Sequence, residues 1–351
     1  MMTSLSACIA QPPAPPSSSV EARQQSHMIW FRKSLRVHDS PALTAAREAA
    51  ESAGAPLVAV FIIDPWFVSS GRVGSLRLQF LLEALHDLDA QLQRSVGIPL
   101  LVPRGSPCDL LPVLWKKYAT VHCTWETDTE PFAVTRDARV SELALVHGVR
   151  TSSISGHTLH SLQSLLDLCP GGGLPTKYND FLRLLAAAGP PREPLPEPTM
   201  LPEPILSASV ALCRADKAGD MALPATLAAM GARAPACGDA ADGQDARRES
   251  GQLEHTVLRG GETAALARLA RVISARGTWV RAFSKPSTNP LKWNPGSTSM
   301  LSPYLKFGCL SCRTLHHELD KAYRTGHKHT KPPQSLHGQL YFREFFYLLS
   351  F

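Results

Sequence analysis

The chain has 351 residues, of which 44% are hydrophobic and 19% are charged, and this balance excludes an intrinsically disordered protein. No apolar run approaches the length of a transmembrane helix, and the eight cysteines are too scattered for a disulfide-stapled secreted domain. The length predicts at least two domains, and the formal net charge of +6 is compatible with a polyanionic partner.

Residues 1–26 form an N-terminal extension rich in Ser, Pro, Ala and Gln, with Arg23 as its single basic residue. This composition cannot bury a core, and we predict disorder. A transit peptide is the alternative. We expect an intracellular protein of the nucleus or cytoplasm, with an organelle left open.

From residue 27 to about 155, short apolar runs alternate with helical patterns. Unbroken apolar runs are typical of strands buried on both faces, and helices between them imply right-handed crossovers. We therefore predict an α/β domain with a doubly wound, Rossmann-like parallel sheet of five strands. The predicted strands are Met28–Phe31, Leu57–Ile63, Pro99–Val102, Val121–Trp125 and Val149–Ser152. The predicted helices are Pro41–Ala53, Ser75–Arg94, Cys108–Tyr118 and Ala133–Val146.

Residues 156–255 are predicted to be a linker. The segment Gly189–Pro204 is too rich in proline for regular structure. Residues 231–251 are Ala-, Gly- and Asp-rich and are predicted to be a disordered, low-complexity insertion.

Helical periodicity returns in residues 256–351. Predicted helices cover Gly260–Ile273 and Cys312–Tyr323, and a last one starts near Ser335. Before the second of these, Ser302 is the predicted N-cap of a helix with Pro303 at its first position. Three hydroxyl residues at 297–299 precede that helix, and free backbone donors with the helix dipole suit a phosphate. A helix start that binds nothing is the alternative.

No metal site is expected. Cys309 and Cys312 form a CxxC pair without a second pair at zinc spacing, and His327 and His329 lack a third ligand.

Two segments, LSPYLKFGCLS (Leu301–Ser311) and GQLYFREFFY (Gly338–Tyr347), resemble the flavin-binding region of the photolyase/cryptochrome family. The resemblance is closest to the branch of (6-4) photolyases and animal-type cryptochromes. WFRKSLRVHDSPAL (Trp30–Leu43) and WETDTEPFAVTRD (Trp125–Asp137) resemble its amino-terminal domain, and PTKYNDFLRLL (Pro175–Leu185) resembles its linker helix. The resemblance implies a light-dependent flavoprotein that binds FAD in an all-α domain.

The resemblance also implies cofactor-binding residues. Those expected at the FAD diphosphate are Thr298, Ser299, Met300, Leu301 and Ser302. Gln339 and Arg343 match positions that line the flavin, and Lys285 could add charge near the phosphates. The spacing of four residues puts Gln339 and Arg343 on one helix face, and a guanidinium can serve a diphosphate and a carboxylate together. The alternative for this pair is a solvated face with a salt bridge to Glu344.

Phe342 is a departure from the family, which carries Trp at this position beside the DNA lesion. Phe342 and Gln339 are the residues expected to contact the DNA lesion. Phenylalanine retains a ring face for stacking on a base but has less area and no indole N–H.

The resemblance allows an antenna chromophore in the α/β domain. Ala133, where some folate-binding relatives carry an acid, argues against a folate, and a domain without a chromophore is the alternative.

The family's helical domain continues past the position matching Phe351, so we expect an incomplete FAD site, negligible FAD retention and loose packing of residues 256–351. No catalytic residue is carried over, because those of the family lie in the part that would follow. We also expect an apolar surface without a partner on the last helix. Its residues are Phe342, Phe345, Phe346, Leu348, Leu349 and Phe351.

Three functions are compatible with these features. The first is a light-driven, (6-4)-like DNA photolyase acting on UV-damaged DNA. The second is a cryptochrome, a blue-light photoreceptor that signals through protein partners. The third is a non-catalytic α/β remnant acting by protein contacts. None of them involves a membrane.

Overall fold

The computed structural model of the protein describes residues 24–68, 73–169, 173–221, 258–275, 277–285, 298–325 and 328–351. Most of the N-terminal extension and the whole 231–251 insertion lie outside these ranges, so their predicted disorder stays a prediction. Within the described ranges, no helix combines the length and apolar character that a membrane crossing requires.

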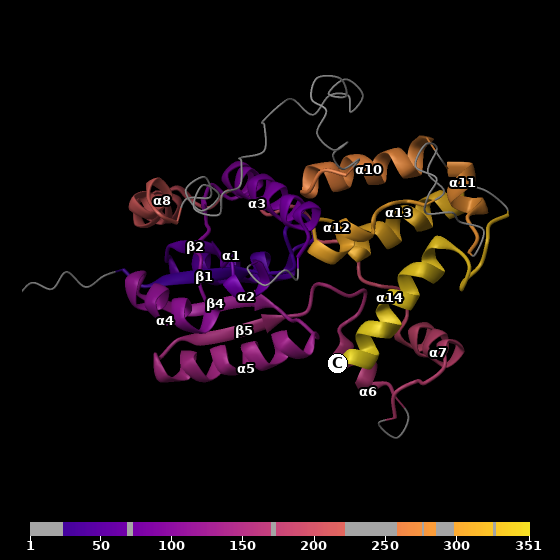
Figure 1. The fold of residues 1–351 in the computed structure, drawn as a ribbon, viewed down its shortest axis with the longest axis horizontal. Helices are drawn as coiled ribbons and strands as arrows, with labels where there is room; N and C mark the ends of the chain where they lie inside the picture. Colours follow the sequence, from indigo (N-terminus) through magenta and orange to yellow (C-terminus); the bar gives the residue numbers. More distant parts are fainter. Residues whose placement is uncertain are drawn as a thin grey trace, which may run out of the picture.

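The amino-terminal half is built on a five-stranded parallel sheet in the order β3-β2-β1-β4-β5 (Figure 1). The strands are β1 (Ser26–Phe31), β2 (Leu57–Phe61), β3 (Leu100–Leu101), β4 (Thr120–Glu126) and β5 (Arg150–Ile154). The helices are α1 (Pro41–Ala53), α2 (Pro65–Val68), α3 (Ser75–Ser95), α4 (Pro107–Lys117) and α5 (Pro131–Val146). The predicted doubly wound fold is confirmed, with element ends within about three residues.

Side chains alternate across the sheet and fill a separate core on each face. Ile29 and Phe31 of β1 pack with residues of α1 and α3, whereas Met28 and Trp30 pack with residues of α4 and α5. The central strands are buried on both faces, which explains their unbroken apolar sequences.

The described part of the predicted linker contains the helices α6 (Leu162–Asp167), α7 (Tyr178–Ala188) and α8 (Glu203–Ala218). The proline-rich stretch before α8 has no helix or strand, as predicted. Helix α8 was not predicted. It contacts β2 and β3, and its Ser209 Oγ accepts a hydrogen bond from the backbone N–H of Leu57 at 2.9 Å.

The carboxyl-terminal helices gather beside the sheet (Figure 1). They are α10 (Glu262–Ala275), α11 (Gly277–Ala282), α12 (Ser302–Phe307), α13 (Cys312–Arg324) and α14 (Leu336–Ser350). The predicted N-cap at Ser302 is wrong: Leu301 precedes the helix and Ser302 is its first residue. Leu301 is buried, and the serine oxygen that faces its backbone N–H belongs to Ser299, at 3.4 Å.

The expected lack of partners for the last helix is wrong in part. Phe345 and Leu348 are buried against side chains of α6 and α7, which were not predicted to fold back on α14. Phe346, Leu349 and Phe351 are exposed, Phe346 by 63%.

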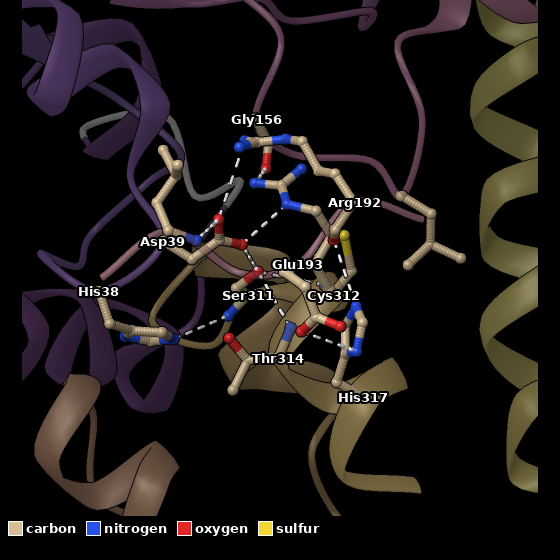
Figure 2. A network of polar contacts seen from close by, with 12 residues as sticks. His38, Asp39, Gly156, Arg192, Glu193, Ser311, Cys312, Thr314 and His317 are labelled. Atoms are coloured by element: carbon tan, nitrogen blue, oxygen red, sulfur yellow. Dashed lines mark hydrogen bonds and ion pairs between the residues drawn. The ribbon is translucent and has the colours of Figure 1, made fainter. Parts of the chain in front are cut away.

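A buried polar network joins the loop after β1 to the carboxyl-terminal helices (Figure 2). The Asp39 carboxylate accepts hydrogen bonds from Ser311 Oγ and from Arg313 Nε, the latter at 2.8 Å. Glu262 of α10 accepts bonds from the backbone N–H groups of Val37 and His38 at 2.7 and 2.9 Å. These contacts fix α10 and α13 on the sheet.

Candidate functional site

A cavity of about 360 Å³ lies among the carboxyl-terminal helices. Residues from two of the predicted site segments line it, namely Ser299, Leu301, Ser302, Gln339 and Arg343. Leucines of α12, α13 and α14 make up most of the remaining wall. A largely apolar pocket with a few convergent polar groups is the usual form of a small-molecule site.

Three other predicted residues lie away from this lining. Thr298 and Met300 flank Ser299 without lining the cavity, and Met300 has a positive φ of 55°. Lys285 is exposed, and its backbone N–H donates to the carbonyl of Gln334 at 3.1 Å. The structure therefore groups five of the eight predicted cofactor residues.

Arg343 is fixed on the cavity wall by its own contacts. Its guanidinium pairs with Glu344, donates to the carbonyl oxygen of His157 at 2.9 Å and lies 4.6 Å from the centre of the Tyr347 ring. Burial opposes its charge, but the carboxylate of Glu344 outweighs burial and raises the pKa of Arg343. The pair with Glu344 matches the alternative drawn from the sequence, except that it is buried instead of solvated.

Gln339 lies one turn before Arg343, and its side-chain amide donates to the carbonyl oxygen of Pro333 at 3.3 Å. Ser335 is the N-cap of helix α14, and its hydroxyl accepts a hydrogen bond from the N–H of Gly338 at 3.1 Å. The spacing of four residues puts Gln339 and Arg343 on the same face of this helix, and both line the cavity.

Phe342 does not line the cavity. Its ring stacks on Tyr178 of α7 at 3.9 Å between centroids and 14° between planes. One face of the ring is therefore covered by the protein itself.

A second cavity, of about 260 Å³, lies at the carboxyl ends of β4 and β5 and was not predicted. Its walls are rich in hydroxyl groups, from Thr127, Thr129, Ser153, Ser155 and Thr158. The signal was the clustering of serine and threonine just after two predicted strands, the edge where ligands bind in open α/β sheets. His157 links the two cavities by contacting both Tyr347 Oη, at 2.8 Å, and Arg343. Burial, followed by the charge of Arg343, lowers the pKa of His157, which favours the neutral ring.

Cys309 and Cys312, the CxxC pair, are free thiols buried in the core. Burial raises the pKa of Cys309 to about 12 and that of Cys312 to about 11, so both keep their protons. His327 lies outside the described residues, and the ring of His329 stacks on Tyr323.

Comparisons with known proteins extend over most of the chain. A family model described as DNA photolyase matches residues 27–199. Cryptochrome-1 of Spalax judaei is 38% identical over 91% of this chain and 49% of its own length. The (6-4)DNA photolyase of Oryza sativa subsp. japonica is 36% identical over 95% of this chain and 58% of its own length. The chain thus spans about half the length of these relatives.

Among solved structures, a cryptochrome from Synechocystis sp. PCC6803 superposes with a TM-score of 0.67 at 21% identity. The match covers 93% of this chain and 61% of that protein. At this identity the likeness concerns the fold.

Proposed function

Since the chain belongs to the photolyase/cryptochrome family, we propose that the larger cavity is one wall of a FAD-binding site in a light-dependent flavoprotein. The observation that carries this proposal is the shared cavity. Ser299 and Ser302 come from one segment and Gln339 and Arg343 from a helix more than 30 residues later, yet all four line it.

The chemistry of these residues suits the cofactor. Serine hydroxyls and a side-chain amide can donate to phosphate oxygens, and a guanidinium supplies the positive charge that a diphosphate needs. Arg343 is held by Glu344 and His157, so its position is set before a ligand binds. The volume of about 360 Å³ is at the small end of the range for ligand pockets.

We propose DNA photolyase activity of the (6-4) type for the protein that carries this site. The substrate would be a pyrimidine photoproduct in UV-damaged DNA, which is extruded at low cost because the lesion has already lost its pairing. Bound reduced FAD would supply light-driven electron transfer, while the chain would bind and orient the reactants. Gln339 is the polar contact proposed for the lesion, and this activity would place the protein with DNA in the nucleus or cytoplasm.

A cryptochrome that senses light and acts through protein partners is the second candidate. The position of Phe342 favours it. Because Tyr178 covers one face of that ring and the side chain lacks an indole N–H, Phe342 offers less to a flipped base than tryptophan does.

For an antenna chromophore, we propose the hydroxyl-lined cavity after β4 and β5. Its walls offer neutral hydroxyl groups and the carboxylate of Asp128 for hydrogen bonding. Ala133 of α5 is buried and does not line this cavity.

The test of the flavin proposal is titration of the full chain with FAD, followed by quenching of flavin fluorescence. We expect weak, saturable binding that is lost on gel filtration. Gln339→Leu and Ser302→Ala should each weaken it at least fivefold, whereas Ser207→Ala on the exposed surface of α8 should leave it unchanged. Equal binding by all variants would refute the assignment.

Light-driven repair of a (6-4) photoproduct in an oligonucleotide, measured with saturating FAD, then separates the two candidates. Repair supports the photolyase. Flavin binding with a light-induced change in proteolytic pattern, but without repair, supports the cryptochrome.

A further inference from the structure

A cluster of three side chains outside the cavity has the composition of a metal site. One ligand atom from each of His316, Asp320 and His337 lies within 4.8 Å of the other two. We propose that these residues bind a divalent transition-metal ion, with Zn²⁺ as the best fit, and that the ion joins α13 to α14.

The three residues come from two helices that pack on each other. His316 and Asp320 are four residues apart on α13, which places them on one helix face. His337 is the second residue of α14, and its ring lies 4.5 Å from that of His316. The ligands are therefore presented by rigid elements and not by a loop.

His316 has a nitrogen without a partner. Its Nε2 lies 3.1 Å from Tyr341 Oη, whereas its buried Nδ1 has no hydrogen-bond partner among the described residues. The nearest charged atom is Asp320 Oδ2 at 3.7 Å, too far for a hydrogen bond. When the ring donates from Nε2 to Tyr341, the lone pair of Nδ1 lies on the side of the Asp320 carboxylate, and a cation between the two would satisfy both groups.

The site closes by small side-chain movements. His337 Nε2 lies 3.6 Å from Asp320 Oδ1 and 3.2 Å from the carbonyl oxygen of His316. On binding a metal, this nitrogen would lose its proton and its long bond to the carbonyl. Asp320 is 34% exposed and free to approach, and its contact with Arg324, at 3.9 Å, involves a side chain that is 82% exposed.

The donor set selects the ion. Two imidazoles and one carboxylate suit zinc, at distances of about 2.0–2.2 Å, and leave a fourth position for water. Hard cations such as Mg²⁺ and Ca²⁺ prefer oxygen ligands and fit poorly.

The site would act on the cavity wall. The residue before each ligand lines the larger cavity: Leu315 precedes His316, Leu319 precedes Asp320 and Leu336 precedes His337. An ion that ties the three ligands together would therefore stiffen the wall formed by α13 and α14. The site itself needs no flavin, so its test is independent of the proposed function.

The experiment is calorimetric titration of the chelator-stripped full chain with Zn²⁺, repeated with Co²⁺ to record the absorption of the bound ion. We expect one Zn²⁺ per chain. Asp320→Asn, which keeps the side-chain volume, and His316→Phe, which keeps a ring, should each weaken binding at least tenfold and abolish the Co²⁺ spectrum.

His317→Gln is the matched control, because His317 lies on the same helix but turns to Glu193 and the carbonyl of Arg192 (Figure 2). It should bind Zn²⁺ as tightly as the wild type. No binding by the wild type, or equal affinity in the wild type and Asp320→Asn, would overturn the proposal. Circular dichroism of each variant verifies that it is folded.

Discussion

Asp39 shows how a single buried charge holds distant parts of this chain together. The residue is fully buried, and its carboxylate receives hydrogen bonds from Ser311, Arg313 and the backbone N–H of Leu195. Burial alone would raise the pKa of Asp39, but the charge of Arg313 and the bond from Ser311 outweigh it and hold the pKa below its usual value.

We expect Asp39→Asn to destabilise the protein by about 3–5 kcal/mol, because it leaves the buried guanidinium of Arg313 without a counter-charge. Asparagine tolerates the positive φ of 41° found at this position, so the change isolates the charge. Urea unfolding measures the effect. Asp180→Asn, which removes an exposed ion pair with Arg183, should cost less than about 1 kcal/mol. Similar losses in the two variants would contradict this account.

Because His27 on β1 is buried, we expect the free energy of unfolding to depend on pH. Burial, followed by the charges of His122 and Arg150, lowers the pKa of His27 to about 4 from an ordinary value of 6.5. Between these two pH values the unfolded chain binds a proton that the folded chain does not. The contribution of His27 is therefore complete above pH 6.5 and is lost as the pH falls toward 4.

His27→Phe removes this titration and keeps a ring beside His122. We expect the loss of stability between pH 7 and pH 5 to be smaller in this variant by roughly 2 kcal/mol. Urea titrations at the two pH values measure the difference. An unchanged pH slope would show that His27 is not protonated on unfolding in this range.

At the scale of elements, Gly308 sets the junction between α12 and the sheet. It has φ of 68°, and a β-carbon there would overlap the backbone carbonyl of Lys33. We expect Gly308→Ala to cost roughly 4 kcal/mol or more, because neither backbone can move without breaking the junction. Thermal unfolding provides the measurement.

Gly54 provides the matched comparison for Gly308. It has nearly the same φ, 60°, but no atom within 4 Å of the added carbon. Gly54→Ala should cost only the left-handed backbone penalty of about 1–2 kcal/mol. A smaller loss for Gly308→Ala than for Gly54→Ala would remove steric contact as the explanation.

The elements that could be predicted from the sequence are those with a clear period or an unbroken apolar run. The helix Pro41–Ala53 has the predicted ends, since proline starts it and Gly54 ends it in the left-handed conformation. Helix α8 was missed because its alternation of Ala, Ser and charged residues resembles a linker, and its fit to β2 and β3 is tertiary information.

At the scale of the whole molecule, the helical spacing predicts that Gln339 and Arg343 lie on one face. It cannot predict that Ser299, from a distant segment, lines the same cavity. The family resemblance predicted that grouping, and the cavity now places the residues together. The cluster of His316, Asp320 and His337 could not be predicted, because two ligands lie on one helix and the third follows a turn whose direction depends on packing. The position of Phe342 outside the cavity could not be predicted either, because it depends on a stacking contact with Tyr178 of α7.

The amino-terminal sheet and the carboxyl-terminal helices share one hydrophobic core. The sequence suggested loose packing after residue 255. In the structure, however, Leu269, Tyr304 and Leu319 belong to the same buried core as Ile29 and Leu85. We therefore expect backbone amides of α13 to exchange with solvent about as slowly as those of β1 in hydrogen-exchange measurements.

Glu262→Gln tests the physical link between the halves. Its carboxylate binds the backbone of Val37 and His38 and the ring of His38. Burial alone would raise the pKa of Glu262, but these bonds hold it below its usual value, so the charged form carries the link. The variant should speed exchange in α10 and α13 at least tenfold while β1 stays protected. Fast exchange of α13 in the wild type would show instead that the sheet folds without the carboxyl-terminal helices.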